Sequence, residues 1–281
     1  MDLISVAILT KNGGHAFEEV LRALSRQVCP IPHEVVILDS GSRDGTLDAA
    51  KAAGAHIHQI RPSEFSFGES RDLLFSKCNG DVIATISQDA LPEGDRWLDA
   101  LTEPLRNGEA DVVQGHEKMD DKTFYWDRIG SFYISSEWRP FLEQYGSPGL
   151  STVNLAVSRS AWEKTGFGPI SMCSDKLFQK RVAECGLRVA VRRDAVVHHG
   201  HHYDVGSLTR RCANEGMALR QLGYAIDLRQ TAKDLIRLRS YRKLASGLLR
   251  GEVRSVAELL FPVLRPAPVW YGNHNLSGYW R

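Results

Sequence analysis

Short apolar runs alternate with amphipathic stretches over roughly the first 115 residues of the chain. Runs of β-branched and aliphatic residues are typical of strands buried in a parallel sheet, whereas apolar residues three or four positions apart indicate helices. The pattern predicts strands at 3–9, 34–38, 56–60, 81–86 and 110–114. It predicts helices at 15–27, 44–53, 68–78 and 95–105, the second of them capped by Ser42 or Asp44. This alternation favours an α/β fold with a mostly parallel, twisted central sheet flanked by helices.

The rest of the chain continues this pattern less regularly. We expect a strand at 152–157, helices at 160–165, 175–185 and 205–222, and two strands at 187–191 and 195–198. The segment 118–148 is rich in aromatic residues, which fits either core packing or an insertion that contacts a ligand.

The chain changes character after residue 225. Its apolar residues form one helical stripe, which comprises Leu235, Leu238, Tyr241, Leu244, Leu248 and Leu249, and basic residues occupy the other faces. We therefore expect a helical C-terminal extension over 226–281. It either packs on the preceding domain with its arginines in water or lies on an anionic membrane surface.

Composition narrows the class of protein. A length of 281 residues with 43% hydrophobic residues suits one large domain with a helical appendage, and a net charge of +1 argues against nucleic acid as a partner. The five cysteines include no CxxC pair, which favours reduced thiols and a cytoplasmic location. The apolar run at the N-terminus is too short for a signal peptide, and no segment reaches the ~18 apolar residues of a membrane span.

Polar clusters follow two of the predicted strands, where ligands bind in open α/β sheets. The first is the stretch DSGSRDGT, residues 39–46, whose short polar side chains and glycines suit a nucleotide but also an ordinary loop. The chain has neither GxGxxG nor GxxxxGK[ST], so a dinucleotide fold and a P-loop lose their main support. The second is Ser87-Gln88-Asp89, where Asp89 is either a ligand for a hard divalent cation or a turn aspartate.

Two further groups are candidates for chemistry. Four histidines lie in the five residues 198–202, and in an extended segment His199 and His201 share one face, where imidazole could bind a metal or a diphosphate. The alternative is a solvated loop. Asp175 begins a predicted helix and is either a general base or a first-turn acid favoured by the helix dipole.

Taken in order, these segments resemble the inverting family 2 glycosyltransferases of GT-A fold. SVAILTKNGG (5–14) is similar to the first motif of that family, and EVVILDSGSRDGT (34–46) is similar to its signature segment. FSFGESRD (65–72), SQDALP (87–92), AVVHHGHHY (195–203) and the Arg-rich helical segment RRCANEGMALRQLG (210–223) resemble the rhamnosyltransferase-like branch. The resemblance covers residues 1–225, with a nucleotide-binding half at 1–115 and an acceptor-side half at 116–225.

The resemblance implies roles for individual residues. Asp175 would be the catalytic base, and Asp89 and His199 would bind a divalent cation, Mg²⁺ or Mn²⁺. The residues that would bind the donor, its diphosphate or the region beside the acceptor are Thr10, Asn12, Asp39, Ser42, Asp44, Arg71, Gln88, His201, Tyr203, Arg210 and Arg211. The implied reaction transfers a sugar, rhamnose or another hexose, from a dTDP-, UDP- or GDP-linked donor to a hydroxyl of a glycan or lipid-linked acceptor, in cell-surface polysaccharide synthesis.

Three departures from the family pattern leave alternatives open. Ser174 stands where the family has glutamate, and Phe67 and Asp72 stand where the branch has histidine and asparagine. The rivals are a degenerate nucleotide-sugar-binding protein, a nucleotidyltransferase, and a histidine metal hydrolase that would need a second ligand cluster. A location at the inner face of the plasma membrane, a peripheral membrane contact and a homodimer are open alternatives for the C-terminal residues.

Overall fold

The computed structural model describes residues 2–132, 138–146 and 149–275, which fall into two compact units. The first unit contains Met1–Lys118, Ser147–Ile170 and Ser174–His199. The second contains Met119–Gly146, Ser171–Cys173 and Gly200–Arg281. The expected boundary at residue 225 lies inside the second unit, so the compact units and the expected functional regions divide the chain differently.

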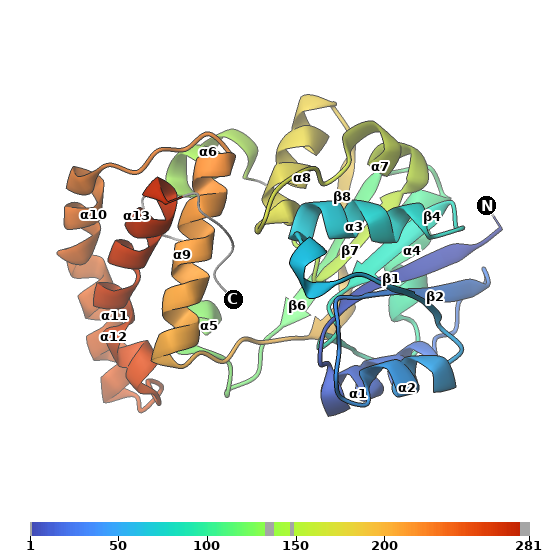
Figure 1. Ribbon diagram of the computed structural model, residues 1–281, viewed down its shortest axis with the longest axis horizontal. Coiled ribbons are helices and arrows are strands. Elements are labelled where there is room, and N and C mark those ends of the chain that lie inside the picture. Colours follow the sequence, from blue (N-terminus) through green and yellow to red (C-terminus); the bar gives the residue numbers. More distant parts are fainter. Residues whose placement is uncertain (1, 133–137, 147–148, 276–281) are drawn as a thin grey trace. The chain divides into compact units, whose positions relative to one another are not determined.

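The first unit is built on one sheet (Figure 1). Its strand order is β3-β2-β1-β4-β7-β6-β8-β5. The strands are β1 (Ile4–Thr10), β2 (His33–Asp39), β3 (His56–Gln59), β4 (Val82–Ile86), β5 (Leu91–Pro92), β6 (Val112–Lys118), β7 (Asn154–Ser158) and β8 (Val189–His198). The pairs β1/β2, β1/β4, β2/β3 and β6/β8 are parallel. Because β7 is antiparallel to both β4 and β6, those two strands also run in the same direction.

Helices cover both faces of this sheet. They are α1 (Gly14–Leu24), α2 (Thr46–Ala52), α3 (Phe67–Ser76), α4 (Trp97–Arg106), α7 (Arg159–Thr165) and α8 (Ser174–Glu184), with the short 3₁₀ helix η1 at Pro62–Glu64. Strand β1 shows the effect in its side chains: Ile4, Val6 and Ile8 pack with α1 and α4, and Ala7 packs with α3 and α8. A strand buried on both faces is mostly apolar, and the buried hydroxyls of β1, on Ser5 and Thr10, are satisfied by hydrogen bonds to Glu34 and Asp39.

The predicted strands and helices of this unit are present, with shifted ends. One prediction is wrong: 187–191 and 195–198 belong to the single strand β8. Arg192 interrupts the apolar pattern, but it forms ion pairs with Asp194 and Glu103 at the surface, so the strand continues through it. The second helix begins one residue after Asp44, since its N-cap residue is Gly45, and Asp44 Oδ1 accepts from the N–H of Thr46 (3.1 Å) at its first position.

The second unit is helical in the residues described. Its helices are α5 (Tyr125–Arg128), α6 (Arg139–Tyr145), α9 (Val205–Gln221), α10 (Leu228–Leu235), α11 (Leu238–Leu249), α12 (Val256–Leu264) and α13 (Pro266–His274). The stripe expected as one element is divided between α10 and α11, because the chain leaves the helix at Ile236 and Arg237. Helices α9 and α13 approach closely at two glycines: a Cβ added to Gly216 or Gly272 would lie under 2 Å from a backbone oxygen of the other helix.

Most aromatic residues of segment 118–148 form the core of this unit. Phe124, Tyr125, Trp126, Phe132, Trp138 and Phe141 are at most 2% exposed. Trp126 stacks on Phe261 of α12, with ring centroids 4.8 Å apart, which ties the segment to the C-terminal helices. Core packing therefore accounts for these six residues, and Tyr133 lies outside the described residues.

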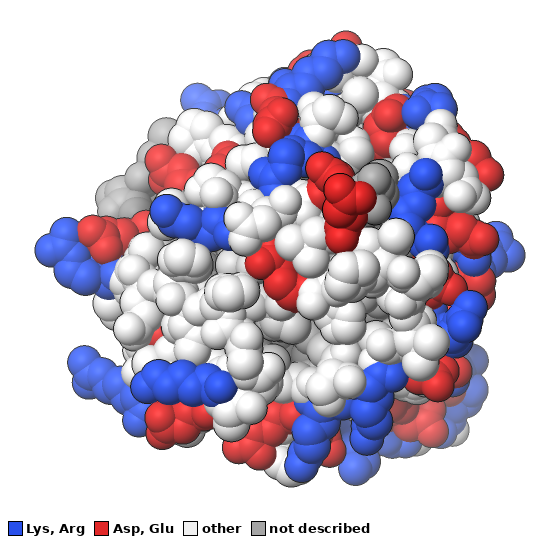
Figure 2. Space-filling view, turned by 90° about the vertical axis from the view of Figure 1, so that its right-hand side faces the viewer, with Lys and Arg blue, Asp and Glu red and all other residues white. Residues whose placement is uncertain are grey.

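The surface carries no large field of one sign on the face shown in Figure 2, where acidic and basic side chains are intermixed around uncharged residues. This agrees with the net charge of +1. Among the helices described, none has the length and apolar character needed to cross a bilayer.

Candidate active site

The loop after β1 joins two polar loops at the carboxyl edge of the sheet. On one side, the backbone N–H of Asn12 donates to Ser42 Oγ (2.8 Å). On the other side, the backbone N–H of Lys11 donates to Gln88 Oε1 (3.0 Å), and Gln88 Nε2 donates back to the Lys11 carbonyl (3.3 Å). The loops after β1, β2 and β4 therefore form one connected edge, as the strand order predicts.

Asp39 lies beneath this edge and is fully buried. Its Oδ1 accepts hydrogen bonds from the backbone N–H groups of Gly41 and Ser42, both at 3.0 Å. Its Oδ2 accepts from the hydroxyls of Thr10 (3.2 Å) and Ser42. All four contacts come from the loops themselves, so in this structure the carboxylate of Asp39 shapes the edge.

Asn12 holds a strained backbone conformation in the same loop. Its φ is +48°, in the left-handed region where asparagine is better tolerated than most residues. Its Oδ1 accepts from the backbone N–H of Arg43 (2.9 Å). Nearby, Asp44 Oδ2 accepts from the N–H of Gly14 (3.1 Å), and hydrogen bonds from Thr46 hold the pKa of Asp44 below its usual range. Such strain at a strand-end loop is a feature of binding sites.

Asp89 is the open carboxylate of this edge. Its side chain is 53% exposed, and its Oδ1 lies 3.6 Å from His199 Nε2. The short strand β5 produces this contact, because Leu91 pairs with His198 and so brings the loop after β4 to the end of β8. The sequence patterns did not reveal β5, which is only two residues long.

His199 lies between two carboxylates. Its side chain is 5% exposed, and its Nδ1 is 3.7 Å from Glu117 Oε2. Glu117 was missed in the sequence because β6 was expected to end at Gln114, whereas it runs to Lys118. Extending that strand would have placed Glu117 at the same edge as Asp89.

The donor set fits a divalent cation bound by few protein groups. Asp89 offers an oxygen and His199 an imidazole nitrogen, and carboxylate and phosphate oxygens suit both Mg²⁺ and Mn²⁺. Within the described part of the chain, no group of three or more His, Cys, Asp or Glu side chains is arranged to hold a metal. The remaining ligands would therefore have to come from water or a bound phosphate, and the second cluster of a histidine hydrolase is missing from those residues.

Asp175 lies in the first turn of α8 and is partly exposed. Its Oδ2 is 3.2 Å from Lys176 Nζ, and that ammonium also donates to the carbonyl of Leu150 (2.6 Å). Its charge also acts on the buried guanidinium of Arg71. Two cations thus balance the carboxylate of Asp175, and Lys176 was not among the residues singled out from the sequence.

A short chain of contacts connects Asp175 to the edge that bears Asp89. Leu150, bonded by Lys176, lies three residues before Val153, whose carbonyl accepts from the N–H of Ser87 (3.2 Å). Ser87 follows β4 directly and precedes Asp89 by two residues. The beginning of α8 and the carboxyl end of β4 are therefore connected through residues 150–153, at the same end of the strands.

Arg71 depends on the residue that departs from the family pattern. Its Nη1 donates to Ser174 Oγ (2.7 Å), and burial lowers the pKa of Arg71 to about 10, while the charges of Asp175 and Asp72 act in the opposite direction. Ser174 thus anchors Arg71 beside Asp175. A second departure, Asp72, accepts from the backbone N–H groups of Phe167 and Gly168, both at 2.8 Å, so it fixes the chain that leads to α8.

The remaining predicted residues belong to the second unit or face outward. His201 stacks on Tyr203, with centroids 5.6 Å apart, and burial raises the pKa of Tyr203. Arg211 lies over Phe132, 6.0 Å from its ring centroid, and Arg210 is exposed on α9. His198 points away from His199, since its Nε2 lies 2.6 Å from Glu93.

Comparisons with known proteins agree with this architecture. The model of the family "Glycosyl transferase family 2" matches residues 5–166. The chain is 25% identical over 213 residues to the O-antigen chain rhamnosyltransferase RfbN of Salmonella typhimurium, covering 71% of this chain and 67% of that protein. It is 24% identical over 214 residues to the O-antigen chain rhamnosyltransferase WbaN of Salmonella anatum, covering 72% and 68%.

A solved structure shares the fold. Glucosyl-3-phosphoglycerate synthase from Mycobacterium tuberculosis, in complex with Mn²⁺, uridine diphosphate and phosphoglyceric acid, superposes with a TM-score of 0.64 at 21% identity. The match covers 79% of this chain and 77% of that one. The expectation of a GT-A fold is thereby confirmed.

Proposed function

Because the chain belongs to glycosyl transferase family 2 and is a glycosyltransferase, we propose that it transfers a hexose with inversion from a nucleotide diphosphate sugar to an acceptor hydroxyl. The observation that carries this proposal is the common edge of Asp89 and Asp175, connected through residues 150–153. A carboxylate that can bind a cation and a carboxylate that can accept a proton on one side of a sheet suit displacement of a diphosphate.

The donor is proposed to bind at the loops after β1 and β2. Asn12, Ser42 and Asp44 line this edge, and Thr10 and Asp39 fix it from below. We propose rhamnose as the first sugar to test, since two relatives are named as rhamnosyltransferases, with dTDP-, UDP- and GDP-linked donors as the candidate nucleotides. The acceptor would be a glycan or a lipid-linked glycan of a cell-surface polysaccharide.

Asp89 and His199 are the residues that would hold Mg²⁺ or Mn²⁺. When bound, such a cation stabilises negative charge on a departing diphosphate as a Lewis acid. Glu117 Oε2 lies 3.7 Å from the other ring nitrogen of His199, so a second carboxylate faces this imidazole. Gln88 contributes by holding the loop after β1 against the loop that carries Asp89.

Asp175 is proposed to act as the general base. Its carboxylate takes the proton of the acceptor hydroxyl while the oxygen attacks the anomeric carbon from the face opposite the diphosphate, so that one displacement inverts that carbon. Lys176 and Arg71 hold the carboxylate in position, and Ser174 in turn holds Arg71. His201, Tyr203, Arg210 and Arg211 are proposed to contact the diphosphate or the acceptor.

The exposed apolar residues of the C-terminal helices support a peripheral contact with an anionic membrane, at the inner face of the plasma membrane. Ile236, Leu238 and Leu249 are 78%, 61% and 90% exposed. Basic residues flank them along α10 and α11, among them Lys233, Arg242 and Arg250, and an interface of apolar side chains with basic neighbours complements anionic lipids. Sedimentation with phosphatidylglycerol vesicles tests this contact. A concentration-dependent dimer without vesicle binding would assign the surface to a second copy instead.

A panel of nucleotide diphosphates and nucleotide sugars, with and without Mn²⁺, tests the activity. We expect one nucleotide to raise the melting temperature in a metal-dependent way, and its sugar to be transferred with inversion, as read by NMR of the anomeric proton. Stabilisation by nucleotide sugars without any transfer or donor hydrolysis would favour a degenerate binding protein. Retention of the anomeric configuration would contradict the role given to Asp175.

A further inference from the structure

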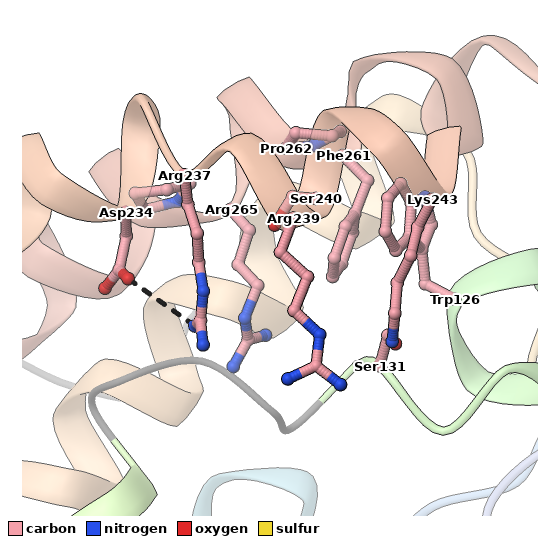
Figure 3. Close-up of a pocket in the computed structure, with 11 residues that line it drawn as sticks. Trp126, Ser131, Asp234, Arg237, Arg239, Ser240, Lys243, Phe261, Pro262 and Arg265 are labelled. Carbon is pink, nitrogen blue, oxygen red and sulfur yellow. Dashed lines mark hydrogen bonds and ion pairs between the residues drawn. The ribbon is translucent and has the colours of Figure 1, made fainter. Parts of the chain in front are cut away.

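A pocket with a basic wall and an aromatic wall lies within the second unit. Its empty space is about 500 Å³, including its opening to solvent. The start of α11 and the junction of α12 with α13 contribute Arg237, Arg239, Lys243 and Arg265 to its lining. In Figure 3 these four side chains extend toward the same space.

The positive charges of the pocket exceed its negative charges. Arg265 forms a buried ion pair with Glu215, and Arg237 lies 3.9 Å from Asp234, the acidic residue of the lining. Among the residues that the structure describes, no carboxylate lies within ion-pair distance of Arg239 or Lys243. Two cations of the lining are thus without a carboxylate partner in that part of the chain, which favours an anion as ligand.

Lys243 is partly buried beside two other cations of the lining, which disfavours its charged form. Its ammonium donates to Ser131 Oγ, and burial lowers the pKa of Lys243, with the charges of Arg239 and Arg237 acting in the same direction. Like charges in a half-buried site repel one another, and a bound anion would remove that cost. The hydroxyl of Ser240 and the beginning of α11, which has no side-chain cap, add donors to the same wall.

Much of the remaining lining is apolar and almost fully buried, with Trp126 1% and Phe261 4% exposed. Trp126 stacks on Phe261, and Pro262 and Pro266 complete this side. Trp126 Nε1 donates to the carbonyl of Glu258 (2.8 Å), so the indole is fixed in place. Helix α11 is fixed against the neighbouring tyrosine, since Tyr125 Oη donates to the Lys243 carbonyl (2.7 Å).

We propose that this pocket binds the phosphoryl group of a phosphate or diphosphate ester. Arg239 and Lys243 contact the phosphoryl oxygens, since guanidinium and ammonium groups are the side chains best suited to them. The identification of this ester with a lipid-linked acceptor rests on the proposed function. The binding site itself does not, and binding is measured without turnover.

Calorimetric titration of the full chain with geranyl diphosphate and with inorganic pyrophosphate tests the site. We expect both to bind, because each presents diphosphate oxygens to Arg239 and Lys243. The R239Q/K243Q variant should lose roughly tenfold in affinity for each charged contact removed. The K233Q/R242Q variant removes the same charge from the same two-helix region outside the pocket and should bind geranyl diphosphate as the unchanged protein does.

The outcomes separate the sources of the phosphoryl group. Equal losses in both variants, or no binding of either diphosphate, would overturn the pocket. Vesicles of phosphatidylcholine with phosphatidylglycerol form the second arm. If only R239Q/K243Q loses geranyl diphosphate, the pocket binds an individual ester. If vesicle binding weakens mainly in K233Q/R242Q, the membrane contacts the surface outside the pocket. Because Arg239 is exposed, the single variant R239Q keeps the test valid if the double variant fails to fold.

Discussion

An aspartate ends β2 and another lies in the loop after β4, both at the carboxyl edge of the sheet, yet the two differ in burial and in partners. Asp39 is fully buried and accepts four hydrogen bonds from its own surroundings. Asp89 is half exposed, and its neighbour His199 is 3.6 Å away, too far for a hydrogen bond. The carboxylate of Asp39 is fully engaged in hydrogen bonds within the protein, whereas the carboxylate of Asp89 is available to a ligand.

This difference separates residues that shape a site from residues that act in it. A buried carboxylate whose oxygens are all satisfied contributes to stability, because removing it leaves backbone N–H groups without partners. An exposed carboxylate beside an imidazole contributes little to folding and can bind a cation. Asp175, partly exposed and balanced by Lys176, belongs with Asp89 on this criterion.

The largest effect on catalysis is expected at Asp175. In Asp175→Asn the amide cannot take the acceptor proton, so the transfer rate should fall by roughly 10²–10⁴-fold while donor affinity stays nearly unchanged. Glu184→Gln, on the same helix and 51% exposed, is the matched control and should transfer normally. Normal turnover by Asp175→Asn, measured with the preferred donor, would remove the base assignment.

Asp89→Ala tests the exposed aspartate. Loss of a ligand for the cation should lower the transfer rate on the order of 10²-fold, because metal stabilisation of the leaving group is worth several kcal/mol. The unfolding free energy should change by less than ~0.5 kcal/mol, as for other exposed positions. Activity as a function of Mn²⁺ concentration, together with urea unfolding, measures both. A variant with normal metal dependence would contradict the ligand role.

Asp39→Ala tests the buried aspartate. The variant leaves two backbone N–H groups and two hydroxyls without their acceptor, so the unfolding free energy should fall by ~2 kcal/mol. Asp48→Ala removes an acid from α2 that is 88% exposed, and its urea unfolding midpoint should stay unchanged. If Asp39→Ala unfolds like the unchanged protein but fails to bind nucleotide, Asp39 is a contact residue and the contrast with Asp89 is lost.

The smallest effect is expected at Glu34, whose largely buried carboxylate lies near the amino end of β2. Burial raises its pKa, but hydrogen bonds from Ser5 and Asn79 and the charge of His56 outweigh burial and hold the pKa below its ordinary value of 4.5. A depressed pKa in the folded state adds stability above the unfolded value, and this gain is lost as pH falls through the folded value. The stability difference between the protein and Glu34→Gln should therefore shrink between about pH 6 and pH 3. A difference that stays constant over this range would contradict the pKa shift.

Local patterns predicted the elements of the sheet because the buried strands are mostly apolar. Strands β1, β2 and β4 begin and end within two residues of their expected positions. The antiparallel insertion of β7 between β4 and β6 could not be read in this way, since pairing of Ile86 with Asn154 depends on residues far apart in the chain. The same holds for β5, which has too few residues to form a pattern.

The candidate site was partly accessible to sequence reasoning. Asp89, Asp175 and His199 follow strands or begin a helix, positions that the chemistry of α/β sheets favours, and the family pattern added their roles as hypotheses. The packing that buries Asp39, the contact of Glu117 with His199 and the use of Ser174 by Arg71 depend on tertiary neighbours. Motifs indicate which residues meet at an edge, and only packing determines which of them stay available.

The path of the chain has a consequence for any attempt to shorten the protein. It passes between the two units five times, after residues 118, 146, 170, 173 and 199. Deleting the residues after 225 would remove Arg265 from Glu215, a carboxylate with no solvent exposure, and would uncover the glycine face at which α9 meets α13. The C-terminal helices are therefore part of the core of the second unit. A chain truncated before them is expected to aggregate and not to yield a smaller active enzyme.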